Sequence, residues 1–148
     1  MDDKTIIGTH TISDVSELKM IANTLAQQLR AGDIVLLQGD LGSGKTTFTQ
    51  FIGKALGVQD KITSPTYAIV AEYEVANNTG IKKFIHMDLY RSNMDTNYVQ
   101  EIVHTAAEQK AVVVIEWSEK LEAKLSSRCW NISIKVDSDK RIMNIERL

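Results

Sequence analysis

The sequence has almost none of the residues that cross-link or stiffen a chain. Its 148 residues include one cysteine, Cys129, and one proline, Pro65. A single cysteine excludes an internal disulfide, which favours a reducing compartment. A single proline excludes a proline-rich linker, and we find no repeat or low-complexity stretch. The length therefore predicts one domain over residues 1–148.

Long apolar runs and an excess of one charge are also missing. No stretch approaches the roughly 20 apolar residues that cross a bilayer, and the first residues lack the basic and apolar segments of a signal peptide. We therefore expect a cytoplasmic protein without a membrane partner. The 17 basic and 19 acidic residues leave a net charge of -2, so nothing draws the chain to nucleic acid in general.

The apolar pattern predicts alternating helices and strands. We expect helices over 14–30, 45–56 and 95–109, and strands over 34–37, 67–75, 81–87, 112–115, 130–136 and 141–145. The run 112–115 is apolar on both faces, which is typical of a central parallel strand. A turn at 77–80 predicts an antiparallel hairpin. The fold class is therefore α/β: a three-layer domain with a mostly parallel central sheet and an antiparallel hairpin.

One segment carries a specific chemical signal. Residues 39–46 read Gly-Asp-Leu-Gly-Ser-Gly-Lys-Thr, which matches the phosphate-binding pattern G-x-x-x-x-G-K-[ST] between a strand and a helix. The glycines let backbone N–H groups wrap a phosphate, and the following helix turns its positive end toward it. Lys45 would reach the β- and γ-phosphates and the Thr46 hydroxyl would bind Mg²⁺. The expected nucleotide contacts are Leu41, Gly42, Ser43, Gly44, Lys45, Thr46 and Thr47.

Acidic residues follow two of the predicted strands. Glu116 comes directly after the strand 112–115, and Asp88 follows the strand 81–87. Ligands bind at the carboxyl ends of strands in open α/β sheets, and a P-loop enzyme needs a carboxylate near its Mg²⁺. We assign Glu116 to the metal because its strand is the more buried type. Asp88 either orients the attacking water or binds the metal through water, and each carboxylate also has the simpler interpretation of a solvated strand end.

Other polar residues are less specific. Thr66 follows a Ser-Pro pair and either senses the γ-phosphate or belongs to a simple turn. Arg91 either supplies charge to the γ-phosphate or is an ordinary surface residue. His86 has apolar neighbours within its strand and is interpreted as structural, and Trp117 as a packing residue. Cys129 has no His or Cys partner in the pattern, so we expect no reactive role for it.

Four blocks of sequence resemble the TsaE family, formerly YjeE, the small bacterial ATPases needed to make threonylcarbamoyladenosine in tRNA. They are residues 39–47, residues 64–67 with Glu72 and Tyr73, residues 86–91 and residues 115–119. Their order and spacing are similar to those of the family over nearly the whole chain. One segment departs from it, because residues 92–102 lack the glycine that usually follows a Glu-Leu pair there.

The resemblance implies an ATPase that is slow alone and acts with the TsaB–TsaD pair, which transfers a threonylcarbamoyl group to the adenosine beside the anticodon. ATP hydrolysis would reset that complex, and tRNA would be reached only through it. In the family pattern, Thr46 and Glu116 hold Mg²⁺, Asp88 serves catalysis or partner coupling, and Thr66 belongs to a switch-like loop. The expected catalytic set is therefore Lys45, Thr66, Asp88 and Glu116, with ATP and Mg²⁺ as cofactors.

Two other function classes share the phosphate loop. A small-molecule kinase needs an arginine-bearing lid, yet the arginines here are scattered along the sequence. A GTP-dependent switch needs Asn-Lys-x-Asp for guanine, and the sequence has none. The second absence is why we expect ATP in preference to GTP.

Overall fold

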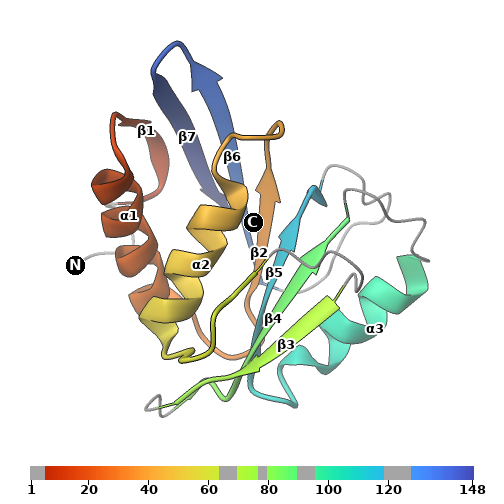
Figure 1. Cartoon of the computed structure of the whole chain (residues 1–148). Coiled ribbons are helices and arrows are strands. Elements are labelled where there is room, and N and C mark those ends of the chain that lie inside the picture. The colour runs from red at the N-terminus through yellow and green to blue at the C-terminus, as the bar shows by residue number, and fades with distance from the viewer. Residues whose placement is uncertain (1–5, 64–69, 77–79, 90–95, 119–127) are drawn as a thin grey trace.

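A seven-stranded sheet with helices on both faces forms the body of the protein in a computed structural model (Figure 1). The structure describes residues 6–63, 70–76, 80–89, 96–118 and 128–148. The helices are α1 (Val15–Gln28), α2 (Lys45–Leu56) and α3 (Thr96–Ala106). The strands are β1 (Gly8–Ile12), β2 (Ile34–Gln38), β3 (Val70–Glu74), β4 (Lys83–Asp88), β5 (Ala111–Glu116), β6 (Cys129–Asp137) and β7 (Lys140–Arg147).

The middle of the sheet is parallel, as predicted. The strand order is β1-β7-β6-β2-β5-β4-β3, and β2 pairs in parallel with both β5 and β6 while β4 pairs in parallel with β5. All six residues of β5 are buried, which explains why this strand is apolar on both faces. The hairpin expected before it is confirmed by the antiparallel pairing of β3 with β4, although its residues 67–69 lie outside the described part of the chain.

The alternation of side chains along the strands divides the core between the two faces of the sheet. Val112 and Val114 pack with α1 and α2, whereas Val113 and Ile115 pack with α3. Figure 1 shows this arrangement, with α1 and α2 on one side of the sheet and α3 on the other. By the same alternation, Glu116 at the end of β5 lies on the side of the sheet that α2 covers.

Local signals set the helix ends. The Asp14 side chain accepts a hydrogen bond from the Glu17 amide and caps α1, and this contact, together with the larger effect of the Ser16 hydroxyl, lowers the pKa of Asp14. Helix α2 has the predicted bounds and is followed by Gly57 as its C-cap, whose φ of 116° is a left-handed conformation that favours glycine. In the described ranges, the helices lack the length and apolar character that a bilayer span requires.

The strand β1 was not predicted. Only Ile12 among its five residues is fully buried, so the segment has little apolar signal of its own. Its backbone pairs antiparallel with β7, from Gly8 opposite Ile145 to Ile12 opposite Arg141. Pairing with a distant strand at the edge of the sheet therefore creates this element, and local propensity does not.

Cys129 begins β6 and is only 2% exposed. Burial raises the pKa of its thiol, and the negative charge of Asp33 raises it further. Asp33 is itself buried and forms an ion pair with Arg128, with 3.1 Å between Nε and Oδ1. Since the thiolate is the reactive form, this environment opposes reaction at neutral pH.

We expect Cys129 to react with an aromatic disulfide reagent at pH 8 about 100-fold or more slowly in the native protein than in urea, because burial and the raised pKa both suppress the accessible thiolate. Absorbance of the released thiolate measures the rate, and the only cysteine of the chain makes the signal specific. Equal rates in the two conditions would contradict the buried position.

Candidate functional site

The loop over 39–44 joins the carboxyl end of β2 to the first turn of α2. Gly39, Gly42 and Gly44 have φ values of 153°, 77° and 110°, which other residues rarely adopt. At Gly39 space is also closed, because a Cβ there would lie 2.6 Å from the Ile134 carbonyl oxygen and 2.8 Å from Ser43 Oγ. The Ser43 hydroxyl oxygen is buried and has no hydrogen-bond partner in the described residues. The loop thus presents an unpaired hydroxyl beside the start of a helix, which suits a bound anion.

Lys45 is folded back over this loop. Its side chain is buried, and Nζ donates to the carbonyl oxygens of Gly39 and of Asp40, the latter at 3.0 Å. The ammonium also lies 3.8 Å from the centre of the Trp117 ring, within the range of a cation–π contact. The loop carbonyls and the ring therefore hold the positive charge where a phosphate group would take over its hydrogen bonds.

Thr46 and Glu116 come together from positions 70 residues apart. Thr46 Oγ1 donates to Glu116 Oε1 at 2.9 Å, joining the first turn of α2 to the end of β5. Hydroxyl and carboxylate oxygens are hard ligands of the kind that Mg²⁺ prefers, and Mg²⁺ usually completes its shell with substrate phosphates and water. The described ranges hold no cluster of three or more His, Cys, Asp or Glu side chains that could bind a metal by themselves. The donor set therefore fits a nucleotide-bound Mg²⁺.

The second oxygen of Glu116 contacts His86. His86 Nε2 forms a hydrogen bond with Glu116 Oε2, and the imidazole is fully buried. His86 Nδ1 has no hydrogen-bond partner in the described part of the chain. The sequence pattern indicated a structural histidine, and the structure places this side chain on the carboxylate of the candidate site.

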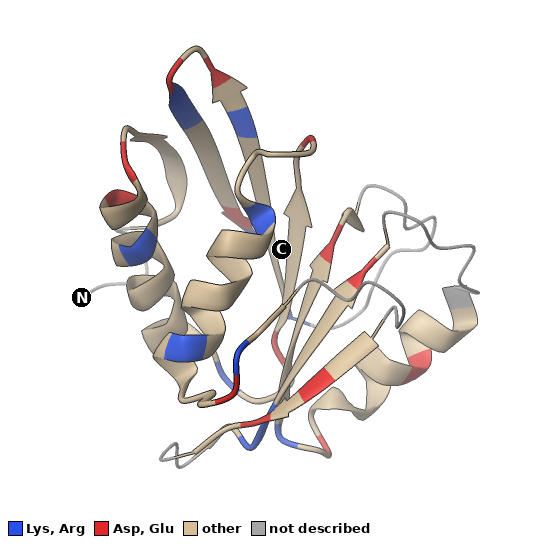
Figure 2. Ribbon diagram, viewed as in Figure 1, with Lys and Arg blue, Asp and Glu red and all other residues tan. Residues whose placement is uncertain are grey.

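Asp88 lies beside Glu116 because β4 and β5 are in parallel register. The two residues are directly opposite each other and end their strands, and Figure 2 shows acidic residues at the ends of both. The Leu89 amide donates to the Glu116 carbonyl oxygen at 3.2 Å, which extends the pairing by one residue. The structure thus gathers Lys45, Thr46, Asp88 and Glu116 at one edge of the sheet, whereas Thr66 and Arg91 lie outside the described residues.

Comparison with known proteins identifies the family. Residues 12–143 match the sequence profile of "Threonylcarbamoyl adenosine biosynthesis protein TsaE". The chain belongs to the TsaE family. A tRNA threonylcarbamoyladenosine biosynthesis protein TsaE from Synechocystis is 38% identical over 74% of this chain and 69% of its own length, and that of Mycobacterium bovis is 34% identical over 91% and 84%. The crystal structure of Bacillus subtilis YdiB superposes with a TM-score of 0.66 at 30% identity, over 91% of this chain and 81% of that one.

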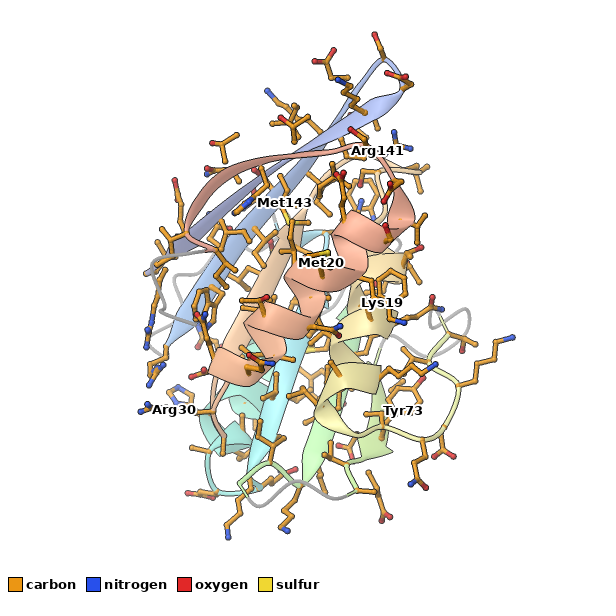
Figure 3. All side chains as sticks on the ribbon, turned by 90° about the vertical axis from the view of Figure 1, so that its left-hand side faces the viewer. Lys19, Met20, Arg30, Tyr73, Arg141 and Met143 are labelled. Carbon is orange, nitrogen blue, oxygen red and sulfur yellow. The ribbon has the colours of Figure 1, made fainter. Side chains whose placement is uncertain are left out.

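Arg141 contacts the loop of the candidate site, which the sequence pattern did not indicate. Arg141, which Figure 3 labels, lies at the beginning of β7. Its Nε donates to the Ser43 carbonyl oxygen at 3.2 Å and its Nη2 to the Gly42 carbonyl oxygen at 3.4 Å. Because the peptide is trans and planar, the Gly44 N–H points away from Arg141. No local pattern could reveal this contact, since 98 residues separate Arg141 from Ser43 and only the β6–β7 hairpin brings them together.

The glycines of the loop provide a matched pair of variants. Gly39→Ala should lower the free energy of unfolding by about 2 kcal/mol or more, because the new Cβ meets the Ile134 carbonyl as well as an unfavourable φ. Gly42→Ala should cost about 1 kcal/mol, since no atom lies near the new Cβ and only the left-handed backbone penalty applies. Urea unfolding followed by circular dichroism measures both. Equal losses would show that β6 does not confine the loop at Gly39.

Proposed function

We propose that this TsaE-family protein is an ATP-binding and Mg²⁺-dependent ATP-hydrolysing subunit with a P-loop NTPase fold. The observation that carries the proposal is the contact of Thr46 with Glu116 beside the buried Lys45 ammonium. A hydroxyl, a carboxylate and an ammonium at the N-terminus of one helix are the groups that a triphosphate with its metal needs.

Each residue of the candidate site has a separate role in this proposal. The loop amides and Lys45 bind the phosphates, and Lys45 exchanges the carbonyl oxygens of Gly39 and Asp40 for phosphate oxygens. Thr46 and Glu116 would hold Mg²⁺, and the chemistry that the ion would supply is neutralisation of negative charge on the phosphates. To Asp88, which lies opposite Glu116, we assign orientation of the attacking water or binding of the metal through water. Thr66 remains the proposed γ-phosphate contact of the following loop.

The biological role rests on family membership. We propose that the chain serves threonylcarbamoyl modification of the adenosine beside the tRNA anticodon, acting with TsaB and TsaD and meeting tRNA only through them. Its relatives are named as tRNA threonylcarbamoyladenosine biosynthesis proteins. Two described arginines do not favour a kinase lid, since Arg141 is bonded to loop carbonyls and Arg128 pairs with Asp33 at the other end of β2 from the loop.

The role is tested by measuring phosphate release with and without the TsaB–TsaD complex. We expect slow ATP hydrolysis by the chain alone and at least about a tenfold increase with the complex, since binding that completes a catalytic site supplies this order of acceleration. GTP serves as the control nucleotide and should be hydrolysed less. Efficient phosphorylation of a small acceptor, with no response to the complex, would instead support a kinase.

The assignment of the metal ligand is tested with Glu116→Ala. Turnover should fall about 100-fold or more, because the variant removes a carboxylate from the metal shell. ATP affinity measured in EDTA should change much less, since the loop and Lys45 bind the phosphates. Asp88→Ala is the matched comparison from the neighbouring strand. If Glu116→Ala left turnover unchanged and Asp88→Ala abolished it, the metal role would pass to Asp88.

A further inference from the structure

We propose that His86 is a positioning residue that holds the Glu116 carboxylate in the orientation in which it binds the nucleotide's metal ion. The inference rests on the proposed function and assigns a task to a residue that contacts neither the phosphate loop nor Thr46 in the described structure. It concerns where the carboxylate points and is independent of any titration of the imidazole.

The register of the sheet explains how His86 reaches Glu116. His86 lies opposite Val114 in the parallel pairing of β4 with β5, and Glu116 is two residues further along β5. Side chains two residues apart share a face of a strand, so Val114 and Glu116 point to the same side as His86. The imidazole therefore meets the carboxylate diagonally across two neighbouring strands, a reach that suits long or aromatic side chains.

The two oxygens of Glu116 have different partners. Oε2 receives the hydrogen bond of His86 Nε2, while Oε1 receives that of Thr46 Oγ1. Both partners of the first bond are buried, at 0% and 2% exposure, so water does not compete for it. With Oε2 held from the side of β4, Oε1 stays turned toward Thr46 and α2. This is the oxygen that a metal ion next to the Thr46 hydroxyl would bind.

The proton of the imidazole is placed by the same contacts. Glu116 Oε2 is an acceptor, so Nε2 carries the hydrogen. Nδ1 is buried and has no partner in the described part of the chain. Of the charged residues of the candidate site, Lys45, Asp88 and Glu116, it is Glu116 that is bonded to His86. The Nε2–H group of His86 thus donates to the carboxylate of the candidate site, and hydrogen bonds of this kind commonly orient metal ligands.

A purely structural histidine makes a different prediction. If His86 only fills the core, substitutions should alter stability and leave the metal dependence of nucleotide binding unchanged. If it positions Glu116, the metal dependence should change according to whether a donor still reaches Oε2. Gln places its amide nitrogen near the position of Nε2, whereas Asn is one carbon shorter and Leu has no donor.

The experiment compares wild type, His86→Gln, His86→Asn, His86→Leu and Glu116→Gln in binding a fluorescent ATP analogue. Each protein is titrated in MgCl₂ and in EDTA. The dissociation constant in EDTA divided by that in MgCl₂ is the Mg²⁺ ratio, which measures how much the metal ion strengthens nucleotide binding. We expect His86→Leu and His86→Asn to reduce this ratio about tenfold, the loss typical of groups that orient metal ligands. Affinity in EDTA should stay within about twofold of wild type, since phosphate binding by the loop is kept. His86→Gln should keep most of the ratio.

Phe84→Leu is the control for packing. Phe84 lies two residues before His86 on the same strand and is fully buried on the same face, so its variant loosens the core without touching Glu116. Urea unfolding compares the stability of every variant. We expect Phe84→Leu to lose stability and keep the wild-type Mg²⁺ ratio. A loss of the ratio equal to that of His86→Leu would overturn the inference, because packing would then explain the effect.

The other outcomes separate the inference from the proposed function. If Glu116→Gln lowers the Mg²⁺ ratio while His86→Leu and His86→Asn retain it, the positioning role is wrong and the metal site stands. If His86→Leu does not fold, the comparison of His86→Asn with His86→Gln decides by the same criterion. If wild type shows no Mg²⁺ effect and Glu116→Gln equals it, both the metal site and the role of His86 are overturned.

Discussion

The parallel pairing of β5 with β2 on one side and β4 on the other is the constraint on which the candidate site depends. It brings the ends of three strands to one edge of the sheet, so that the phosphate loop after β2, Glu116 on β5 and Asp88 on β4 meet there. Since the pairing also alternates side chains between the two cores, a shift of one residue would turn Glu116 toward α3 and away from Thr46. The register of the sheet therefore determines whether Glu116 and Thr46 can meet.

The cost of burying charge explains how the site is held together. Glu116 and Lys45 are almost completely buried, and a buried charge that loses its partner destabilises a protein by about 3–5 kcal/mol. Glu116 meets this requirement with Thr46 and His86, and Lys45 with the loop carbonyls and the Trp117 ring. Each of these contacts also fixes a direction, so the groups that stabilise the two charges also set where their side chains point.

Short-range pattern was sufficient for most of the fold. Helix α2, the buried run of β5 and the β3–β4 hairpin were predictable because each has a strong local signal: a glycine-rich loop with a terminating glycine, a continuous apolar run, and a turn between two strands. Strand β1 was not, because its residues alternate weakly and its hydrogen-bond partner β7 lies at the other end of the chain. Whether such an edge strand forms therefore depends on the tertiary structure.

The same division holds for the site. The sequence by itself determined the family and predicted the glycine-rich loop over 39–46 and the candidate residues Lys45, Thr46, Asp88 and Glu116, because fixed spacing within short blocks carries that information. Only the tertiary structure decided that His86 bonds Glu116 and that Arg141 bonds the loop carbonyls of Gly42 and Ser43. Both contacts cross between strands or from a strand to a distant loop, and their geometry depends on sheet register, which no local pattern of residues encodes.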